Sequence, residues 1–343
     1  MINKKILITG GLGYIGSKFL SIYENQYKLK ILDTNYFANN KPINSTHEVL
    51  IKDIRDLTLS DVKNVDYVLH LSELSNDPLG NIKSNLTNEI NVLGTKKLID
   101  LCNESNVQNF IYMSSCSVYG KTKDNYVDED SATNPLTAYS SSKILNEKYI
   151  FENNHNFPIT IFRNATVFGY SPNLRLDLVI NDLTYSAYKY QKITLNSDGT
   201  PKRPFVHIQD LVALINYFFE KNLYFDNQII NIGNEILNFS IKEVAEVISA
   251  ITGVKDITFG KSDRDQRSYL VKFDKFKNLI PEFNFEFDLK LGVKDLMENF
   301  KYYEEKISSR RINQIQNLLK QKKLIITLGG INLVFEKPNL FQK

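Results

Sequence analysis

The residues of this chain that could do chemistry together are Ser115, Tyr139 and Lys143. The four-residue spacing of Tyr139 and Lys143 places both side chains on one face of a helix, one turn apart. A tyrosine has an ordinary pKa of about 10, so it accepts protons poorly at neutral pH unless a nearby cation favours the phenolate. Lys143 and a positive nicotinamide ring could supply that charge. Tyr139 would then take a proton from a substrate hydroxyl whose carbon loses hydride, while Ser115 holds the oxygen.

This spacing alone is not specific, because the chain has 19 tyrosines. It recurs at Tyr14/Lys18, Tyr119/Lys123, Tyr185/Lys189, Tyr188/Lys192, Tyr217/Lys221 and Tyr302/Lys306. The pair at 139 and 143 differs in context, because it follows Asn134 and Pro135, a good N-cap and first helical residue. It also follows an expected strand at 109–113, and the carboxyl ends of such strands present ligands in a doubly wound sheet. We therefore interpret this pair as catalytic, the alternative being two residues on a helix surface.

A glycine-rich turn near the start of the chain predicts a dinucleotide site. Gly10, Gly13 and Gly16 lie between an expected strand at 5–9 and an expected helix at 14–24. Each glycine lacks a Cβ that would block the turn, the phosphate or the contact between helix and sheet. The helix would direct its N–H groups and the positive end of its dipole at that phosphate.

The next expected strand, at 29–32, ends in Asp33. An acidic residue at this distance from the glycines meets the adenosine ribose in dinucleotide sites. Its carboxylate would accept a hydrogen bond from the 2′-hydroxyl and repel a 2′-phosphate, so NAD is favoured over NADP. The alternative is an ordinary strand-to-helix turn followed by a surface aspartate.

With these motifs, the chain resembles an extended short-chain dehydrogenase/reductase of the NAD-dependent nucleotide-sugar epimerase/dehydratase family, from residue 4 to about 300. Further matches follow in the same order, at His70–Pro78, Asn91–Thr95, Ser114–Gly120, Arg163–Gly169 and Arg203–His207. The resemblance implies an NAD-dependent enzyme that oxidises a nucleotide-activated sugar at C4, in surface polysaccharide biosynthesis. The cofactor-binding residues that it implies are Gly10, Gly13, Tyr14, Ile15, Gly16, Asp33, Asp53, Ile54, Leu71, Ser72, Glu73, Asn91, Tyr139 and Lys143.

Within the family pattern, the residues after Ser115 bear on the type of reaction. In 4,6-dehydratases the next two residues are an Asp-Glu acid-base pair that expels water, whereas this chain has Cys116 and Ser117. Dehydration is therefore disfavoured, which leaves a 4-epimerase or a 4-dehydrogenase. Two departures from the family remain: Thr166 stands where relatives place a substrate-binding asparagine, and Ser72-Glu73 stands where they place two alanines. The Glu73 carboxylate could orient a sugar hydroxyl or face solvent.

The substrate contacts follow from the two negative charges of a nucleotide diphosphate, which planar guanidinium groups bind well. Arg203 and Arg267 match the two diphosphate arginines of the family, the alternative being surface ion pairs. Ser75, Ser115 and Thr166 are candidates for the sugar, and Asn181 is one for the nucleotide. No residue decides among GDP-, UDP- and dTDP-linked sugars.

The 343 residues, 42% of them hydrophobic, can bury a large core. Strands and helices alternate through about residue 168, and with the resemblance this predicts an α/β fold: a Rossmann doubly wound parallel sheet with a smaller, interleaved C-terminal substrate lobe. We expect an NAD-binding domain over 1–169 to which 203–233 return. The lobe that binds the nucleotide sugar would comprise 170–202 and 234–308. The family does not account for 309–343, where the pattern predicts a basic amphipathic helix and a possible hairpin about Gly329-Gly330.

Composition also narrows the class of partner and compartment. A net charge of +3 without a basic run in the first 300 residues does not imply nucleic acid. Two cysteines, Cys102 and Cys116, suggest neither a disulfide framework nor a metal site. Without a signal peptide or an apolar stretch long enough to span a bilayer, we expect a cytoplasmic homo-oligomer, a dimer or tetramer. The alternative from another class is a catalytically idle NAD-binding protein that regulates or scaffolds partners.

Overall fold

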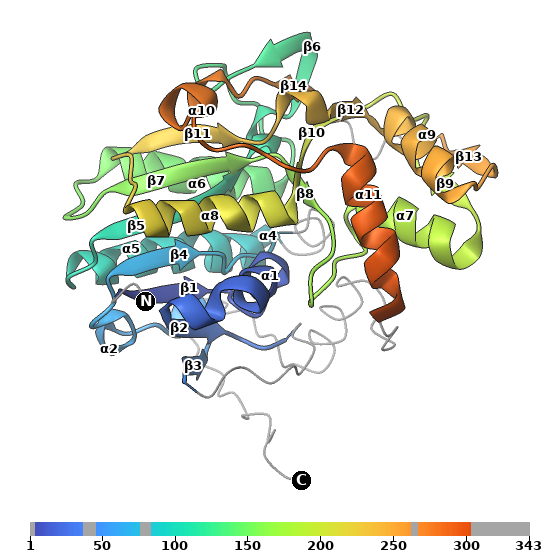
Figure 1. Cartoon of the computed structure of the whole chain (residues 1–343). Coiled ribbons are helices and arrows are strands. Elements are labelled where there is room, and N and C mark those ends of the chain that lie inside the picture. The colour runs from blue at the N-terminus through green and yellow to red at the C-terminus, as the bar shows by residue number, and fades with distance from the viewer. Residues whose placement is uncertain (1–3, 37–45, 76–83, 262–266, 303–343) are drawn as a thin grey trace.

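A seven-stranded parallel sheet forms the centre of the structure, a computed structural model that describes residues 4–36, 46–75, 84–261 and 267–302 (Figure 1). Its strands are β1 (Lys5–Thr9), β2 (Lys28–Asp33), β3 (Glu48–Ile51), β4 (Tyr67–His70), β5 (Asn109–Ser115), β7 (Ile159–Asn164) and β11 (Gln228–Ile232). Their order across the sheet is β11-β7-β5-β4-β1-β2-β3, with every neighbouring pair parallel. The inner strands are buried on both faces, as in Ile6, Leu7 and Ile8 of β1, which explains their continuous apolar runs.

The strand order reverses between β1 and β4. From β1 the chain proceeds outward through β2 and β3, and from β4 it proceeds in the other direction through β5, β7 and β11. In such sheets a crevice opens at the carboxyl ends of the two strands where the order reverses, and ligands bind there. The expected Rossmann architecture is thus confirmed.

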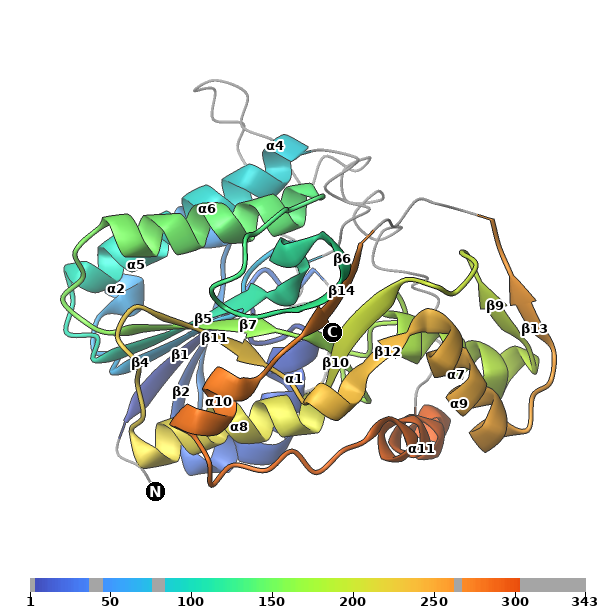
Figure 2. The ribbon, with the colours of Figure 1, turned by 90° about the horizontal axis from the view of Figure 1, so that it is seen from above.

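Helices cover both faces of this sheet (Figure 2). The helices among the described residues are α1 (Tyr14–Tyr23), α2 (Leu59–Val62), α4 (Ser84–Thr87), α5 (Gly94–Asn103), α6 (Ala138–Glu152), α7 (Val179–Tyr190), α8 (Ile208–Lys221), α9 (Ile241–Thr252), α10 (Asp274–Leu279) and α11 (Leu289–Asn299). Helices α5 and α6 pack on one face, and α1 and α8 on the other, each over its own apolar cluster. A π-helical turn at Asn88–Leu93 leads into α5.

A second group of elements lies beyond the carboxyl ends of the central strands (Figure 2). It contains a three-stranded sheet, β8 (Thr166–Phe168), β10 (Lys202–His207) and β12 (Asn238–Ser240), and the pair β9 (Ile193–Leu195) with β13 (Ile257–Phe259). Helices α7, α9 and α11 contact one another over a separate apolar cluster. The pair β6 (Lys121–Val127) with β14 (Ser268–Val271) connects this region to the end of β5.

One boundary differs from the sequence expectations. The N-cap expected at Asn134 is wrong: α6 begins after Thr137, whose side chain and that of Ser140 form a capping box. The expected tail at 309–343 lies outside the described residues.

Candidate active site

A cavity of about 1170 Å³ opens at the carboxyl ends of β1, β2, β4 and β5, and residues of the second group form its far wall. Most of the residues singled out from the sequence line it: Gly10, Gly13, Tyr14, Ile15, Gly16, Asp33, Asp53, Ile54, Leu71, Ser72, Glu73, Ser75, Ser115, Tyr139, Lys143, Thr166, Arg203 and Arg267. Asn91 and Asn181 lie behind the cavity wall instead. Segments far apart in the sequence therefore meet at the edge of the sheet that the strand order predicts.

The glycine turn after β1 has no room for side chains. Gly10 has φ +68°, and a Cβ there would lie 2.7 Å from the Leu71 carbonyl carbon. A Cβ on Gly16 would lie 2.4 Å from the Gly11 oxygen. These contacts bring the N-terminus of α1 against the end of β4, where its N–H groups face the cavity. This cradle fits the diphosphate of a dinucleotide.

The carboxylate of Asp33, at the end of β2, is held by backbone N–H groups. Its two oxygens accept hydrogen bonds from Leu12 N–H (3.0 Å) and Asn35 N–H (2.8 Å). These two donors fix the carboxylate on the cavity wall, where a ribose hydroxyl can reach it. Asp53 differs, because both of its oxygens bind the guanidinium of Arg55, at 3.0 and 2.9 Å. Its contact with the cofactor stays a prediction.

Buried polar side chains hold the segment that follows β4 in place. One ring nitrogen of His70 lies 2.7 Å from the Thr9 hydroxyl, and the other lies 2.7 Å from the Thr95 hydroxyl. Burial and the nearby Lys143 lower the pKa of His70 to about 3, so the ring is neutral. Asn91 accepts from Leu74 N–H at 2.8 Å and donates to its carbonyl at 3.2 Å. Asn91 thus supports the floor of the cavity, and its contact with the cofactor stays a prediction.

Tyr139 and Lys143 both lie on α6 and both line the cavity. The Lys143 ammonium lies 5.2 Å from the centre of the Tyr139 ring. Among the Tyr-x-x-x-Lys pairs whose two side chains are described, this pair alone has both members at the cavity. The context that distinguished it in the sequence was therefore informative, although the N-cap residue was not the one expected.

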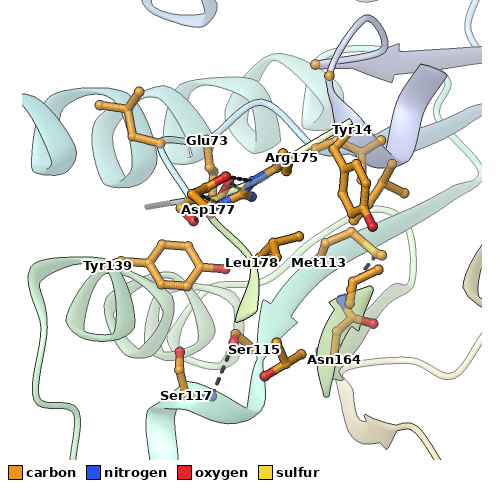
Figure 3. Close-up of a pocket in the computed structure, with 18 of the residues that line it drawn as sticks. Tyr14, Glu73, Met113, Ser115, Ser117, Tyr139, Asn164, Arg175, Asp177 and Leu178 are labelled. Carbon is orange, nitrogen blue, oxygen red and sulfur yellow. Dashed lines mark hydrogen bonds and ion pairs between the residues drawn. The ribbon is translucent and has the colours of Figure 1, made fainter. Parts of the chain in front are cut away.

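Ser115 ends β5 and faces the same space (Figure 3). Its Oγ accepts from Ser117 N–H at 3.1 Å, which leaves its own O–H able to donate toward a ligand. In Figure 3 the hydroxyls of Ser115 and Tyr139 approach the middle of the cavity from different elements. Such a pair can hold one substrate oxygen between a hydrogen-bond donor and a proton acceptor.

Lys143, which lies beside Tyr139, has a charged partner of its own. It forms an ion pair with Glu73, and each of the two side chains is only 4% exposed. The ammonium also donates to the Met113 carbonyl at 2.5 Å. Burial acts to lower the pKa of Lys143, but the attraction of Glu73 and Tyr139 outweighs it, so the pKa lies above its ordinary value. Glu73 therefore points at Lys143 and is not directed to solvent.

A second, partly buried ion pair, Arg175 with Asp177, was missed in the sequence. Arg175 binds both oxygens of Asp177, at 3.0 and 2.7 Å, and donates to the Ser75 hydroxyl at 2.8 Å. Burial acts to lower the pKa of Arg175, yet Asp177 and the tyrosines 139 and 14 keep it above the ordinary value. The signal that could have revealed the pair is two charged residues inside the apolar stretch 174–180.

Two further cavity residues missed in the sequence are Asn164 and Ser117. Their atoms Asn164 Oδ1 and Ser117 Oγ are buried and have no hydrogen-bond partner within the described residues. The Asn164 amide nitrogen donates to the Ser114 carbonyl at 3.2 Å, which leaves the oxygen as the acceptor. Buried polar atoms normally have partners, so both are candidates for ligand contact.

The substrate residues fall into two groups. Arg203 donates to the backbone carbonyl of Arg267 and lies 5.4 Å from the centre of the Tyr269 ring, so the two expected diphosphate arginines come together. Asn181 accepts from Gly169 N–H at 2.9 Å and donates to the Tyr14 hydroxyl at 3.2 Å. Its side chain joins α7 to the loop after β8, and its nucleotide contact stays a prediction.

Neither a membrane helix nor a metal cluster is found among residues 4–36, 46–75, 84–261 and 267–302. No helix there has the length and apolar character needed to cross a bilayer. No group of three or more His, Cys, Asp or Glu side chains there is arranged to hold a metal ion.

Comparisons with known proteins agree with this geometry. The family model described as "NAD dependent epimerase/dehydratase family" matches residues 6–233. Over 302 residues the chain is 30% identical to the "Putative UDP-glucose 4-epimerase" of Methanocaldococcus jannaschii, covering 84% of this chain and 96% of that protein. It is 28% identical over 263 residues to the dTDP-D-glucose 4,6-dehydratase of Mus musculus, covering 72% and 73%. The UDP-glucuronic acid 4-epimerase of Bacillus cereus, solved with UDP-glucuronic acid and NAD, superposes with a TM-score of 0.76 at 25% identity, covering 87% and 99%.

Proposed function

This chain belongs to the NAD dependent epimerase/dehydratase family, and from that premise we propose that it is a nucleotide-sugar 4-epimerase. It is an enzyme that uses NAD, and the cofactor expected from the sequence is confirmed. The observation that carries the finer proposal is the meeting of Ser115, Tyr139 and Lys143 at one cavity, next to a cradle for a dinucleotide. The proposed role is in surface polysaccharide biosynthesis.

The chemistry follows from the positions of these groups. When bound, NAD takes up hydride from the sugar carbon. Tyr139 accepts the proton of the C4 hydroxyl, and Ser115 donates a hydrogen bond to the same oxygen. The Lys143 ammonium stabilises the Tyr139 phenolate and can hold the nicotinamide ribose. In an epimerase Tyr139 would return its proton to the C4 oxygen as the hydride returns to the other face of the keto-sugar.

Dehydration has less support, because it needs a further acid and base beside the sugar. The positions that carry this pair in 4,6-dehydratases hold Cys116 and Ser117. Burial raises the pKa of the Cys116 thiol, which therefore stays protonated. Of the other carboxylates at the cavity, Glu73 and Asp177 are engaged by Lys143 and Arg175.

For the substrate we propose a UDP-linked hexose or a close relative, held by Arg203 and Arg267 through its diphosphate. The Methanocaldococcus and Bacillus proteins, whose names specify UDP-linked sugars, support this choice. We also propose that the enzyme acts in the cytoplasm as a homo-oligomer, a dimer or tetramer. The two cysteines, Cys102 and Cys116, are buried and unbridged, as a reducing compartment would leave them.

The test is to incubate the purified protein with a panel of UDP-, dTDP-, GDP- and CDP-sugars, and to follow both the NADH absorbance band and the sugar product. A C4 epimer without net NADH is expected. A 4-keto product with a persistent NADH band would identify a 4-dehydrogenase, and a 4-keto-6-deoxy product would identify a dehydratase; either would overturn the epimerase proposal.

The matching variant is Tyr139→Phe, which removes the proton acceptor. Turnover should fall by about 10²–10⁴-fold while NAD binding persists. The control is Tyr217→Phe, which changes a tyrosine of the same spacing whose hydroxyl donates to Glu282 at the surface, at 3.0 Å. Near-normal turnover of the Tyr139→Phe variant would contradict the assignment.

A further inference from the structure

We propose that Glu73 is a positioning residue, which holds Lys143 beside Tyr139 and sets the pH range in which the pair works. The proposal rests on the proposed function, because it takes Tyr139 as the proton acceptor. It goes beyond the family pattern, since the position of Glu73 is an alanine in the relatives that the sequence resembles.

The geometry places the Glu73 carboxylate inside a closed set of contacts. One oxygen pairs with Lys143, and the other accepts from the Tyr112 hydroxyl at 3.0 Å and from the Asn146 amide at 3.4 Å. Asn146 also donates to the Asn91 carbonyl at 2.7 Å, which ties the set to the cavity floor. Both oxygens of Glu73 are therefore engaged by protein donors, and its influence on Tyr139 passes through Lys143.

Lys143 has three N–H donors, of which Glu73 and the Met113 carbonyl take two. One donor remains for a ligand hydroxyl or for Tyr139. The ammonium is held between two rings, 5.0 Å from the centre of Tyr112 and 5.2 Å from that of Tyr139. A flexible lysine is thus fixed in one direction. Without the carboxylate, a buried ammonium would lose its counter-ion and its direction together.

The negative charge of Glu73 shifts the pKa of Lys143 and the pKa of Tyr139 in the same direction. A negative charge raises the pKa of every titrating group near it, so Glu73 keeps Lys143 protonated and also delays ionisation of Tyr139. Removing that charge should lower both pKa values. The profile of kcat/KM against pH has one limb set by ionisation of Tyr139 and another set by deprotonation of Lys143. Both limbs should then move to lower pH.

The other charged or titrating groups around the pair leave this sign unchanged. From α6, Glu147 is neutralised by Arg163, whose guanidinium binds it at 3.0 and 2.7 Å. From β4, His70 is neutral, because burial and Lys143 lower its pKa to about 3. Burial raises the pKa of Tyr112, on β5, well above its ordinary value. On the far wall, the cation of Arg175 is paired with Asp177 (Figure 3). Glu73 is thus the partner that decides the charge around Lys143.

The test substitutes Glu73→Gln, which keeps the shape and removes the charge. We expect both limbs of the kcat/KM profile to move to lower pH by on the order of one pH unit. Glu73→Asp, which retains the charge on a shorter side chain, should return the profile toward that of the wild type even if turnover stays low. The control is Glu152→Gln at the end of the same helix, which removes an exposed carboxylate paired with Lys148 and should leave both limbs in place.

A second measurement works without a substrate. The absorbance of tyrosinate is followed against pH in the NAD-bound protein, and the curve of the Tyr139→Phe variant is subtracted to isolate Tyr139. The midpoint should lie lower in the Glu73→Gln background than in the wild type. An unchanged midpoint, or a loss of turnover with both limbs in place, would overturn the role of Glu73. If no sugar is turned over, or if Tyr139→Phe is active, the proposed function fails instead, and the tyrosinate midpoint still tests the effect of Glu73.

Discussion

At the scale of single residues, we expect Asp33 to set the preference for NAD over NADP. Its carboxylate is oriented by Leu12 and Asn35 N–H groups and lines the cavity. A hydrogen bond to a charged group contributes about 1.5–3 kcal/mol, so Asp33→Ser should weaken NAD binding by about 10–100-fold. NADP binding should improve, because the repulsion of the 2′-phosphate is removed. Titration of the variant with each dinucleotide measures both effects.

The control for this prediction is Asp53→Asn. Asp53 also lines the cavity, but Arg55 already binds both of its oxygens. The ratio of NAD to NADP affinity should therefore change little in this variant. Equal changes in the two variants, or an unchanged ratio in Asp33→Ser, would show that the preference arises elsewhere.

The site residues that the sequence reveals are those defined by local spacing. The glycine turn, Ser115 and the pair Tyr139/Lys143 each lie within one strand-turn-helix segment, so their relation can be inferred from short-range geometry. The partner of Lys143 could not be inferred, because Glu73 is 70 residues away. The same holds for Arg175, which reaches Ser75 across 100 residues. Such contacts depend on how distant elements pack.

At the scale of elements, the first turn of α6 positions Tyr139, the proposed proton acceptor. Thr137 accepts from Ser140 N–H at 3.1 Å, and Tyr139 lies in the turn that this bond closes. Thr137→Ala should cost about 1 kcal/mol of folding free energy, and kcat should also fall because the first turn frays. Urea unfolding and steady-state kinetics measure the two quantities separately.

A matched control lies at the start of α11, where Asp288 accepts from Leu291 N–H at 2.7 Å. No residue of this helix lines the cavity. Asp288→Ala should therefore lose a similar free energy of unfolding with kcat retained. A fall in kcat of the same size in both variants would mean that lost stability, and not the position of Tyr139, limits the Thr137 variant.

The elements themselves could largely be predicted, because alternating apolar runs and amphipathic segments determine strands and helices. The segment 203–233 was expected to return to the Rossmann domain, and its strand β11 does pair with β7. The N-cap of α6 could not be predicted, because Asn134 and Thr137 are both good N-cap residues. Asn134 instead donates its N–H to the Val118 carbonyl at 2.8 Å, so a tertiary contact decided between them.

At the scale of the whole molecule, the cavity forms only where the edge of the central sheet meets the second group of elements. Tyr14, at the start of α1, donates to the Gly169 carbonyl at 2.7 Å, and Asn181 of α7 donates to the Tyr14 hydroxyl. The glycine turn and the far wall of the cavity are therefore joined by buried hydrogen bonds. The sequence indicated an interleaved lobe, but not these contacts, because they depend on the packing of the assembled chain.

His70 makes the stability of this assembly depend on pH. Its ring joins β1 to α5 through Thr9 and Thr95, and its pKa is lowered by burial and by Lys143 from 6.5 to about 3. Below pH 6.5 the unfolded chain binds a proton that the folded protein excludes, so stability falls as the pH drops, until the folded protein also binds the proton near pH 3.

The variant that removes this titration is His70→Asn, whose side chain can still bridge hydroxyl groups. Between about pH 7 and about pH 5 the wild type should lose about 2 kcal/mol more of its unfolding free energy than the variant. Urea unfolding of the protein without cofactor measures the difference, so that NAD affinity does not enter. If the two proteins lose stability in parallel, the excluded proton is not on His70, and the buried link between β1 and α5 does not limit stability in acid.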